Sequence, residues 1–374
     1  MKVLHINCNY IGTTLHQLMV EELGRNGYDN QVYVPTYNRN LAVITPNKNV
    51  IISECFKKWD RLIFDYKQGK IIRNLQKEVD ISSFELIHAH TVFTDGNCAR
   101  KMSRKYHIPY VVTVRNTDVN SFFAKMIHLR GRGIKIMRDA KAIFFLSEAY
   151  RKQVFDKYVP RKFHDELWSK SKIVPNGVDN FWFENSLCNA VRENCDNPIK
   201  LIYVGRIDRN KNIPTIQKAM DILWDRGYSA NLTVVGKVQD EKEYETIVKH
   251  TNTTCLPPMN KEKLIEAYRS SDIFVMPSFT ETFGLVYVEA MSQGLPVIYS
   301  IGQGFDGQFS EGIVGYHADA HSPESVANAI VKVVENYFSL TAAVVEKSQK
   351  FNWSEIAKSY CDIYGNIKDL ECMH

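Results

Sequence analysis

Short apolar segments alternate with helical stretches along almost the whole chain, and this alternation restricts the possible folds more than any other feature. Six such segments precede residue 175 and five follow it. They are residues 2–7, 31–34, 86–90, 110–114, 142–146, 172–174, 200–204, 231–235, 254–256, 273–276 and 297–300. Strands joined through helices pair in parallel, because the helix returns the chain to the starting edge of the sheet. The sequence therefore predicts an α/β protein built on parallel sheets.

The chain of 374 residues is long enough for two domains, and its charge is divided unequally along its length. Residues 1–180 contain 29 Lys and Arg against 17 Asp and Glu, a net charge of +12, whereas the remainder has a net charge of −7. An irregular polar stretch that starts at Pro175 separates the two sets of strands. We expect an N-terminal domain over residues 1–180, a C-terminal domain over residues 181–352 and a last helix over residues 353–374.

Composition argues against several classes of protein. No apolar run reaches the roughly 18 residues that a membrane-spanning helix needs. The first residues read as a strand rather than as a signal peptide. Eight scattered cysteines without a C-x-x-C pair indicate reduced thiols and no metal site. These features predict a cytoplasmic protein.

One strand–turn–helix segment carries two carboxylates in a setting that favours ligand binding. Glu281 lies in the turn after residues 273–276, and Glu289 lies eight residues later in an apolar helix that Gly294 ends. A charge on a buried helix needs a partner, because its desolvation is costly. The amides near Gly284 begin the helix and favour a phosphate. A nucleotide sugar fits this set, with sugar hydroxyls on Glu281 and ribose hydroxyls on Glu289.

This segment resembles the E-x7-E element of retaining nucleotide-sugar glycosyltransferases with two Rossmann-like domains (the GT-B class), in particular family 4. The agreement extends over nearly the whole chain, through residues 86–90, 112–114, 175–179 and 204–211. It implies two Rossmann-like domains with parallel sheets that face each other across a cleft. The first domain would bind the acceptor, the second would bind the nucleotide sugar, and the last helix would pack on the first.

The resemblance also implies roles for individual residues. The catalytic candidates are His90, Arg206, Lys211 and Glu281, and the two cations would clamp the diphosphate. His88, on the same strand face as His90, is expected in the core. The donor-binding candidates are Gly12, Gly205, Gly236, Lys237, Thr282, Phe283, Gly284, Leu285 and Glu289.

Some positions depart from the family's usual pattern or allow two interpretations. A single Gly12 stands where relatives usually have two glycines, and it serves either a ligand or a plain turn. Arg115 begins the segment 115–118, in which relatives commonly carry a histidine and small residues. Its side chain would either bind an anionic acceptor or pair with Asp118. The glycine-rich turn 302–307 either lies near the sugar or only needs positive φ angles.

The expected mechanism follows from what the sequence lacks. It has no D-x-D motif, so we expect no metal cofactor. Arg206, Lys211 and the helix amides would stabilise the leaving diphosphate instead. No carboxylate nucleophile is evident, so a front-face reaction with retention is the hypothesis.

Basic residues are interleaved with apolar ones at residues 125–138 and continue through residues 151–170. Such a surface can adsorb on anionic lipid, or it can be the solvated face of an ordinary core helix. No nucleic-acid-binding motif accompanies these charges, so no nucleic acid partner is expected.

Sequence and resemblance together predict a transferase that moves a sugar from a nucleoside diphosphate sugar to a glycan or lipid-linked acceptor. Its expected setting is cell-surface polysaccharide synthesis, in the cytoplasm or peripherally on the inner face of the membrane. Two alternatives stay open: a sugar-nucleotide epimerase or sugar-phosphate synthase of the same fold, and a non-catalytic nucleotide-sugar-binding subunit.

Overall fold

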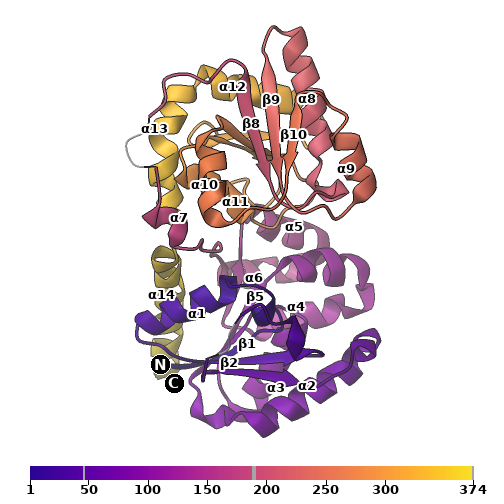
Figure 1. The fold of residues 1–374 in the computed structure, drawn as a ribbon. Coiled ribbons are helices and arrows are strands. Elements are labelled where there is room, and N and C mark those ends of the chain that lie inside the picture. Colours follow the sequence, from indigo (N-terminus) through magenta and orange to yellow (C-terminus); the bar gives the residue numbers. More distant parts are fainter. Residues whose placement is uncertain (45–46, 188–190, 373–374) are drawn as a thin grey trace. The chain divides into compact units, whose positions relative to one another are not determined.

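The computed structural model describes residues 1–44, 47–187 and 191–372 and divides into two compact units (Figure 1). Unit 1 contains Met1–Leu146, Arg151–Gly177 and Trp353–His374, and unit 2 contains Ser147–Tyr150 and Val178–Asn352. The chain therefore leaves unit 1 after Gly177 and returns to it at Trp353.

Unit 1 is built on a seven-stranded parallel sheet of order β3-β2-β1-β4-β5-β6-β7. Its strands are β1 (Lys2–Ile6), β2 (Asp29–Thr36), β3 (Val50–Glu54), β4 (Leu86–Ala89), β5 (Tyr110–Val114), β6 (Ala142–Phe145) and β7 (Ser171–Ile173). Its helices are α1 (Leu15–Arg25), α2 (Phe64–Glu78), α3 (Thr94–Tyr106), α4 (Arg130–Asp139), α5 (Glu148–Tyr158), whose first three residues count with unit 2, α6 (His164–Lys170) and α14 (Trp353–Cys372).

The last helix, α14, completes the core of unit 1. Its apolar side chains recur at helical spacing and pack against the central strands, together with α1. The buried residues of this cluster are Val3, Met19, Leu23, Leu86, Val111, Ala142, Phe144, Val174, Trp353, Ile356, Ala357, Tyr360, Tyr364 and Ile367. Gly177 lets the chain pass Trp353, because a Cβ at residue 177 would lie 2.3 Å from the indole ring.

Unit 2 is built on a six-stranded parallel sheet of order β10-β9-β8-β11-β12-β13. Its strands are β8 (Ile199–Val204), β9 (Ala230–Val235), β10 (Thr253–Leu256), β11 (Ile273–Met276), β12 (Val297–Ser300) and β13 (Gly315–Ala318). Its helices are α7 (Phe181–Glu184), α8 (Ile213–Asp225), α9 (Glu241–Ile247), α10 (Lys261–Arg269), α11 (Leu285–Ser292), α12 (Pro323–Glu335) and α13 (Tyr337–Ser348). In Figure 1, α8 and α12 lie side by side along this sheet.

The predicted fold class is confirmed, and all eleven predicted strands are present. Two further strands, β3 and β13, were not predicted. Both are edge strands and pair on one side only. Among the described residues, no helix is both long and apolar enough to cross a membrane.

Both sheets reverse their strand order at one point. In unit 1 the order reverses between β1 and β4, and in unit 2 between β8 and β11. Loops that leave two such neighbouring strands run in opposite directions, which leaves a crevice at the carboxyl ends of the strands where ligands bind in open α/β sheets. These two reversal points are therefore where a site is expected.

Candidate functional site

The reversal point of unit 2 brings together the residues that the sequence selected. Gly205 and Arg206 follow β8, Lys211 lies in the same loop, and Glu281 lies in the loop after β11. The two loops are joined directly, because the Asn210 amide group donates to the Thr280 carbonyl oxygen at 2.9 Å. Residues 70 positions apart in the sequence thus form one wall of a crevice.

Lys211 and Glu281 form an ion pair in this wall. The Lys211 Nζ lies 2.6 Å from the Glu281 Oε2, and the two side chains are only 12% and 15% exposed. The other carboxylate oxygen, Oε1, accepts hydrogen bonds from the amides of Thr282 at 2.9 Å and Phe283 at 3.4 Å. The predicted phosphate-binding cation and sugar-binding carboxylate therefore bind each other in this structure.

The first turn of α11 begins at a glycine in the left-handed region. Gly284 has a φ of 78°, and a Cβ there would lie 2.5 Å from the ring of Tyr287. No side chain caps the helix. Because Glu281 already accepts from the two preceding amides, the amides of Gly284 and Leu285 are the ones left for an anion. Phe283 contributes only its backbone, since its ring is 2% exposed in the core.

The glycine-rich turn 302–307 holds Glu281 in place. The Gln303 side chain accepts from the Glu281 amide at 2.9 Å, and the Gly304 amide donates to the Glu281 carbonyl oxygen at 2.8 Å. A Cβ at Gly304 would lie 1.7 Å from the Thr282 carbonyl oxygen. A close approach of two backbones therefore requires Gly304, and Gln303 is a positioning residue that the sequence did not reveal.

Glu289 lies on α11 with one hydrogen-bond donor nearby. The Tyr268 hydroxyl donates to its Oε2 at 3.4 Å. Burial raises the pKa of Glu289 to about 7, and the Tyr268 hydroxyl and Lys261 oppose this shift only in part. A half-buried carboxyl group with spare acceptor capacity is suited to a pair of ligand hydroxyls.

The remaining predicted residues of unit 2 differ in their exposure and in their contacts. Arg206 is 59% exposed at its side chain, and its Nε lies 3.7 Å from the Asp208 carboxylate. Lys237 is exposed. Gly236 has a structural reason to be glycine, because a Cβ there would lie 1.7 Å from the Gly205 carbonyl oxygen.

His90, at the reversal point of unit 1, is 1% exposed and belongs to a network of buried histidines. Its ring stacks on that of His88, with centroids 4.1 Å apart. His88 contacts the Tyr364 hydroxyl of α14 at 2.6 Å and the Thr113 hydroxyl at 2.8 Å, so it lies in the core. The Nε2 of His90 lies 3.0 Å from the Nδ1 of His5.

The proton positions in this network follow from Asn30. Its Nδ2 donates to two backbone carbonyl oxygens, which turns its Oδ1 toward the Nε2 of His5 at 3.0 Å. His5 must therefore donate from Nε2. Burial lowers the pKa of His5 to about 4, so its ring is neutral and its Nδ1 accepts a hydrogen bond from the Nε2 of His90. His90, whose pKa burial also lowers, then has its lone pair on Nδ1.

His5, His88 and His90 lie close enough together to be considered as metal ligands. Five of their six ring nitrogens, however, have protein partners among the described residues, and only the Nδ1 of His90 has none. The hydrogen-bond network accounts for the cluster without an ion. The six described cysteines that are free of disulfides do not join it, and Cys188 lies outside the described residues.

Gly12 lines a cavity of about 790 Å³ at the same end of unit 1. Nothing lies within 4 Å of a Cβ placed on Gly12, so its own neighbours do not require a glycine. The cavity also receives Lys67 of α2 and the aromatic rings of Phe64 and Phe122, none of which the sequence had selected.

Arg115 does not reach this cavity's lining. Its side chain is buried and donates to the Asn176 Oδ1 at 2.6 Å, while its backbone amide donates to Asp118 at 2.9 Å. Of the two interpretations, the structure therefore shows the contact with Asp118, and it does so through the backbone. Burial raises the pKa of Asp118 to about 6.

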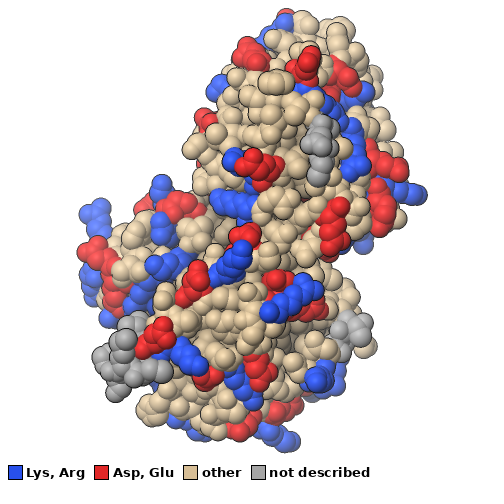
Figure 2. Space-filling model, turned by 90° about the vertical axis from the view of Figure 1, so that its left-hand side faces the viewer, with Lys and Arg blue, Asp and Glu red and all other residues tan. Residues whose placement is uncertain are grey.

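Several cations of the basic segment have intramolecular partners. Arg132 pairs with Asp65, and Arg138 pairs with Glu166. Arg130 donates to the Phe123 carbonyl oxygen at 2.6 Å. On the face drawn in Figure 2, Lys and Arg side chains are interspersed with Asp and Glu. These contacts agree with a solvated face over a core helix for this part of α4.

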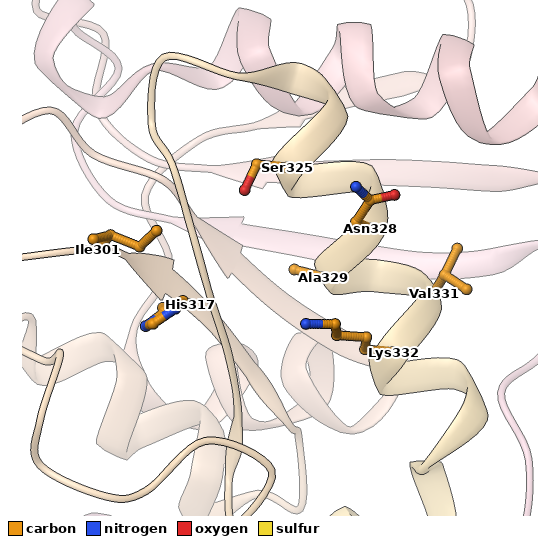
Figure 3. A pocket seen from close by; sticks show the side chains of 7 residues that line it. All are labelled: Ile301, His317, Ser325, Asn328, Ala329, Val331 and Lys332. Carbon is orange, nitrogen blue, oxygen red and sulfur yellow. The ribbon is translucent and has the colours of Figure 1, made fainter.

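A separate pocket of about 410 Å³ lies between β13 and α12 of unit 2 (Figure 3). Its lining residues are Ile301, His317, Ser325, Asn328, Ala329, Val331 and Lys332. None of the predicted site residues takes part in it.

Comparison with solved structures defines the class of the fold. Sucrose-phosphate synthase from Thermosynechococcus elongatus superposes with a TM-score of 0.76 at 18% identity, over 98% of this chain and 99% of that one. The Anabaena protein HepE, in complex with UDP and glucose, superposes with a TM-score of 0.69 at 15% identity, over 98% and 100% of the two chains. The fold is that of the GT-B glycosyltransferases.

Comparison of sequences gives the family. Residues 190–351 match the family described as "Glycosyl transferases group 1", and residues 13–180 match "Glycosyltransferase Family 4". An uncharacterised glycosyltransferase of Methanocaldococcus jannaschii is 25% identical over 381 residues, 92% of each chain. The chain belongs to the group 1 glycosyltransferases and is an enzyme of that kind.

Proposed function

We propose that the protein transfers a sugar from a nucleoside diphosphate sugar to an acceptor hydroxyl, with retention of configuration and without a metal ion. The observation that carries the proposal is the buried contact between Lys211 and Glu281 at the reversal point of unit 2. A structure of the same fold with UDP and glucose supports the donor class.

When the donor binds, its diphosphate replaces the Glu281 carboxylate as the partner of Lys211. The diphosphate is a stronger partner for Lys211 than one carboxylate, because the whole group carries two negative charges against one. Arg206 has a largely exposed side chain with one distant carboxylate neighbour, so it can turn onto the diphosphate. Release from Lys211 frees the Glu281 Oε2 to accept hydrogen bonds from the sugar hydroxyls.

The reaction is a front-face displacement. The acceptor oxygen forms a bond to the anomeric carbon as the bond from that carbon to the diphosphate oxygen breaks. The acceptor proton passes to the departing phosphate oxygen. Arg206, Lys211 and the amides of Gly284 and Leu285 stabilise the developing charge. Glu281 is unsuited to act as a nucleophile, because backbone amides hold its second oxygen.

His90 has a place in this proposal as a neutral residue. Because its Nε2 donates a hydrogen bond to His5, only its Nδ1 lone pair is left to accept one. We also propose that the protein acts in the cytoplasm, in the synthesis of a polysaccharide.

The test is donor binding in the presence of EDTA. We expect one nucleotide sugar from a panel to raise the melting temperature, and Lys211→Met to lower its affinity at least about 10-fold. Lys347→Met, which removes a lysine from the exposed side of α13, is the matched control. Loss of binding on removal of divalent metal would refute the metal-independent arrangement. No shift with any nucleotide sugar would refute the donor site.

A further inference from the structure

The cavity of unit 1 contains cations that the proposed transfer does not use. It lies where β1, β2, β4 and β5 end, at the reversal point of that sheet. Lys67, from α2, is 9% exposed, and its Nζ contacts the Thr94 hydroxyl at 3.3 Å. Among the described residues, no carboxylate forms an ion pair with it. Burial lowers the pKa of Lys67, and the nearby Asp95, which forms no ion pair with it in the described part of the chain, opposes this shift only in part.

A second cation stands nearer the mouth of the cavity. Arg61 is exposed and lies 5.9 Å from the centre of the Tyr37 ring. It has no ion pair within the described part of the chain. Two cations without carboxylate partners, one of them buried, are suited to a ligand phosphate.

The walls between these cations are aromatic. Phe64 and Phe122 lie edge to face with ring centres 6.0 Å apart, and Tyr37 and Phe56 lie 6.2 Å apart. All four line the cavity. Such walls favour an apolar part of the ligand immediately beyond its charge.

Segments that contribute to the lining of the cavity expose an unusual share of the chain's large apolar side chains. They are the 3₁₀ turns Arg39–Leu41, Lys58–Leu62 and Ile127–Leu129 with their neighbours. Of the 15 large hydrophobic side chains that are exposed in the described residues, 8 belong to these segments. They are Leu41, Val43, Trp59, Leu62, Ile63, Tyr66, Met126 and Ile127. Three of the eight, Leu41, Leu62 and Met126, line the cavity itself. Exposed apolar side chains beside a pocket are costly in water and mark an interaction site.

We propose that this cavity binds the phosphate and first methylenes of a lipid-linked acceptor, whose hydroxyl receives the sugar, an inference that rests on the proposed function. The phosphate contacts Lys67 and Arg61, the first methylenes lie between the aromatic walls, and the chain leaves over Leu62 and Met126. A neutral glycan would stack on the same rings, but it would leave the two cations without an anionic ligand and the exposed apolar side chains in water.

The experiment measures binding of simple alkyl phosphates without any donor. The probes are octyl and dodecyl phosphate below their micelle concentrations, inorganic phosphate, and dodecyl maltoside. We expect dodecyl phosphate to bind at least 10-fold more tightly than octyl phosphate, because each buried methylene contributes up to about four-fold. Inorganic phosphate and dodecyl maltoside are expected to bind at least about 10-fold more weakly than dodecyl phosphate.

Two variants separate the two parts of the site. Lys67→Met should remove the preference for dodecyl phosphate over dodecyl maltoside. The double variant Leu62→Ser, Ile63→Ser should remove the dependence of alkyl phosphate affinity on chain length. We expect this variant to fold, because both side chains are mostly exposed. Phe338→Ser, an exposed apolar residue of α13, is the control and should change neither.

Equal affinity for octyl and dodecyl phosphate, or chain-length dependence that survives in the double variant, would overturn the proposal. So would tighter binding of a neutral oligosaccharide than of dodecyl phosphate. Because no donor is present, these results are independent of the nucleotide-sugar experiment. Alkyl phosphate binding without any nucleotide-sugar binding would refute the proposed function and leave a lipid-phosphate binding site.

Discussion

Lys211 and Glu281 show how a single contact can be both structural and functional. Each of the two side chains neutralises the charge of the other, and Glu281 also accepts hydrogen bonds from two amides. Removing one partner leaves a charge in a mostly buried position, whereas removing both does not. The proposed diphosphate takes over the role of the carboxylate.

A double-mutant cycle tests this exchange. Lys211→Met and Glu281→Gln should each cost about 1–3 kcal/mol of unfolding free energy, and the double variant should cost less than their sum. In saturating UDP the coupling should fall toward zero, because the phosphate then binds Lys211. The exposed pair Lys358–Glu355 is the control, with a coupling of about 0.5 kcal/mol or less. Coupling that is unchanged by UDP would contradict the exchange.

Glu289 predicts a pH dependence of stability. Its pKa is about 7 in the folded protein against an ordinary value of 4.5. The folded state therefore binds the Glu289 proton more tightly than the unfolded state does. The stabilisation that this proton confers is complete below pH 4.5 and is lost as the pH rises through about 7. The unfolding free energy of the wild type minus that of Glu289→Gln should decrease across this window in chemical denaturation. An increase would show that the carboxylate form is the stabilised one.

At this scale the sequence selected residues, but it did not predict their contacts. Residue type and spacing selected Arg206, Lys211, Glu281 and Glu289, and the roles of these residues stay predictions. The mutual pairing of Lys211 with Glu281 joins two loops 70 residues apart, and no local pattern encodes it. Lys67 was missed because it lies among ordinary charged residues of an amphipathic helix, where only the fold shows that it is buried.

Strands in the middle of each sheet were easier to predict than strands at its edges. A central parallel strand is buried on both faces, so β5 and β11 read as unbroken apolar runs and were predicted to the residue. The edge strands β3 and β13 each contain partly exposed positions and polar residues. A short segment of mixed polarity is hard to distinguish from a loop, and both were missed.

The loops that follow the parallel strands differ in how closely their backbones approach neighbouring residues. Gly236→Ala should destabilise the protein by a few kcal/mol, because its Cβ would lie 1.7 Å from the Gly205 carbonyl oxygen. Gly12→Ala should change stability by less than about 0.5 kcal/mol, because nothing lies within 4 Å. Thermal unfolding of both variants measures this contrast. Equal losses would mean that the two glycines have the same structural role.

Over the whole molecule, the arrangement of the chain makes unit 1 depend on its last helix. Trp353, Tyr360 and Tyr364 of α14 are buried in the core of that unit, and Tyr364 also contacts His88. Unit 2 is continuous apart from Ser147–Tyr150. Loss of α14 should therefore affect the two units very differently.

A chain that ends at Asn352 tests this asymmetry. We expect unit 1 to become susceptible to protease, because removal of α14 exposes the apolar face on its sheet, while residues 178–352 stay resistant. Tyr364→Phe, which removes one hydroxyl, is the milder comparison and should cost about 1 kcal/mol. Protection of unit 1 in the shortened chain would show that its other helices are sufficient.

The return of the chain to unit 1 at Trp353 also sets an order of events during synthesis. A ribosome makes residues 178–352 after most of unit 1 and before α14. The first unit in the sequence thus waits with part of its core uncovered while the second unit is made. A chaperone that binds nascent chains would meet that uncovered sheet face for the whole time that unit 2 is being translated.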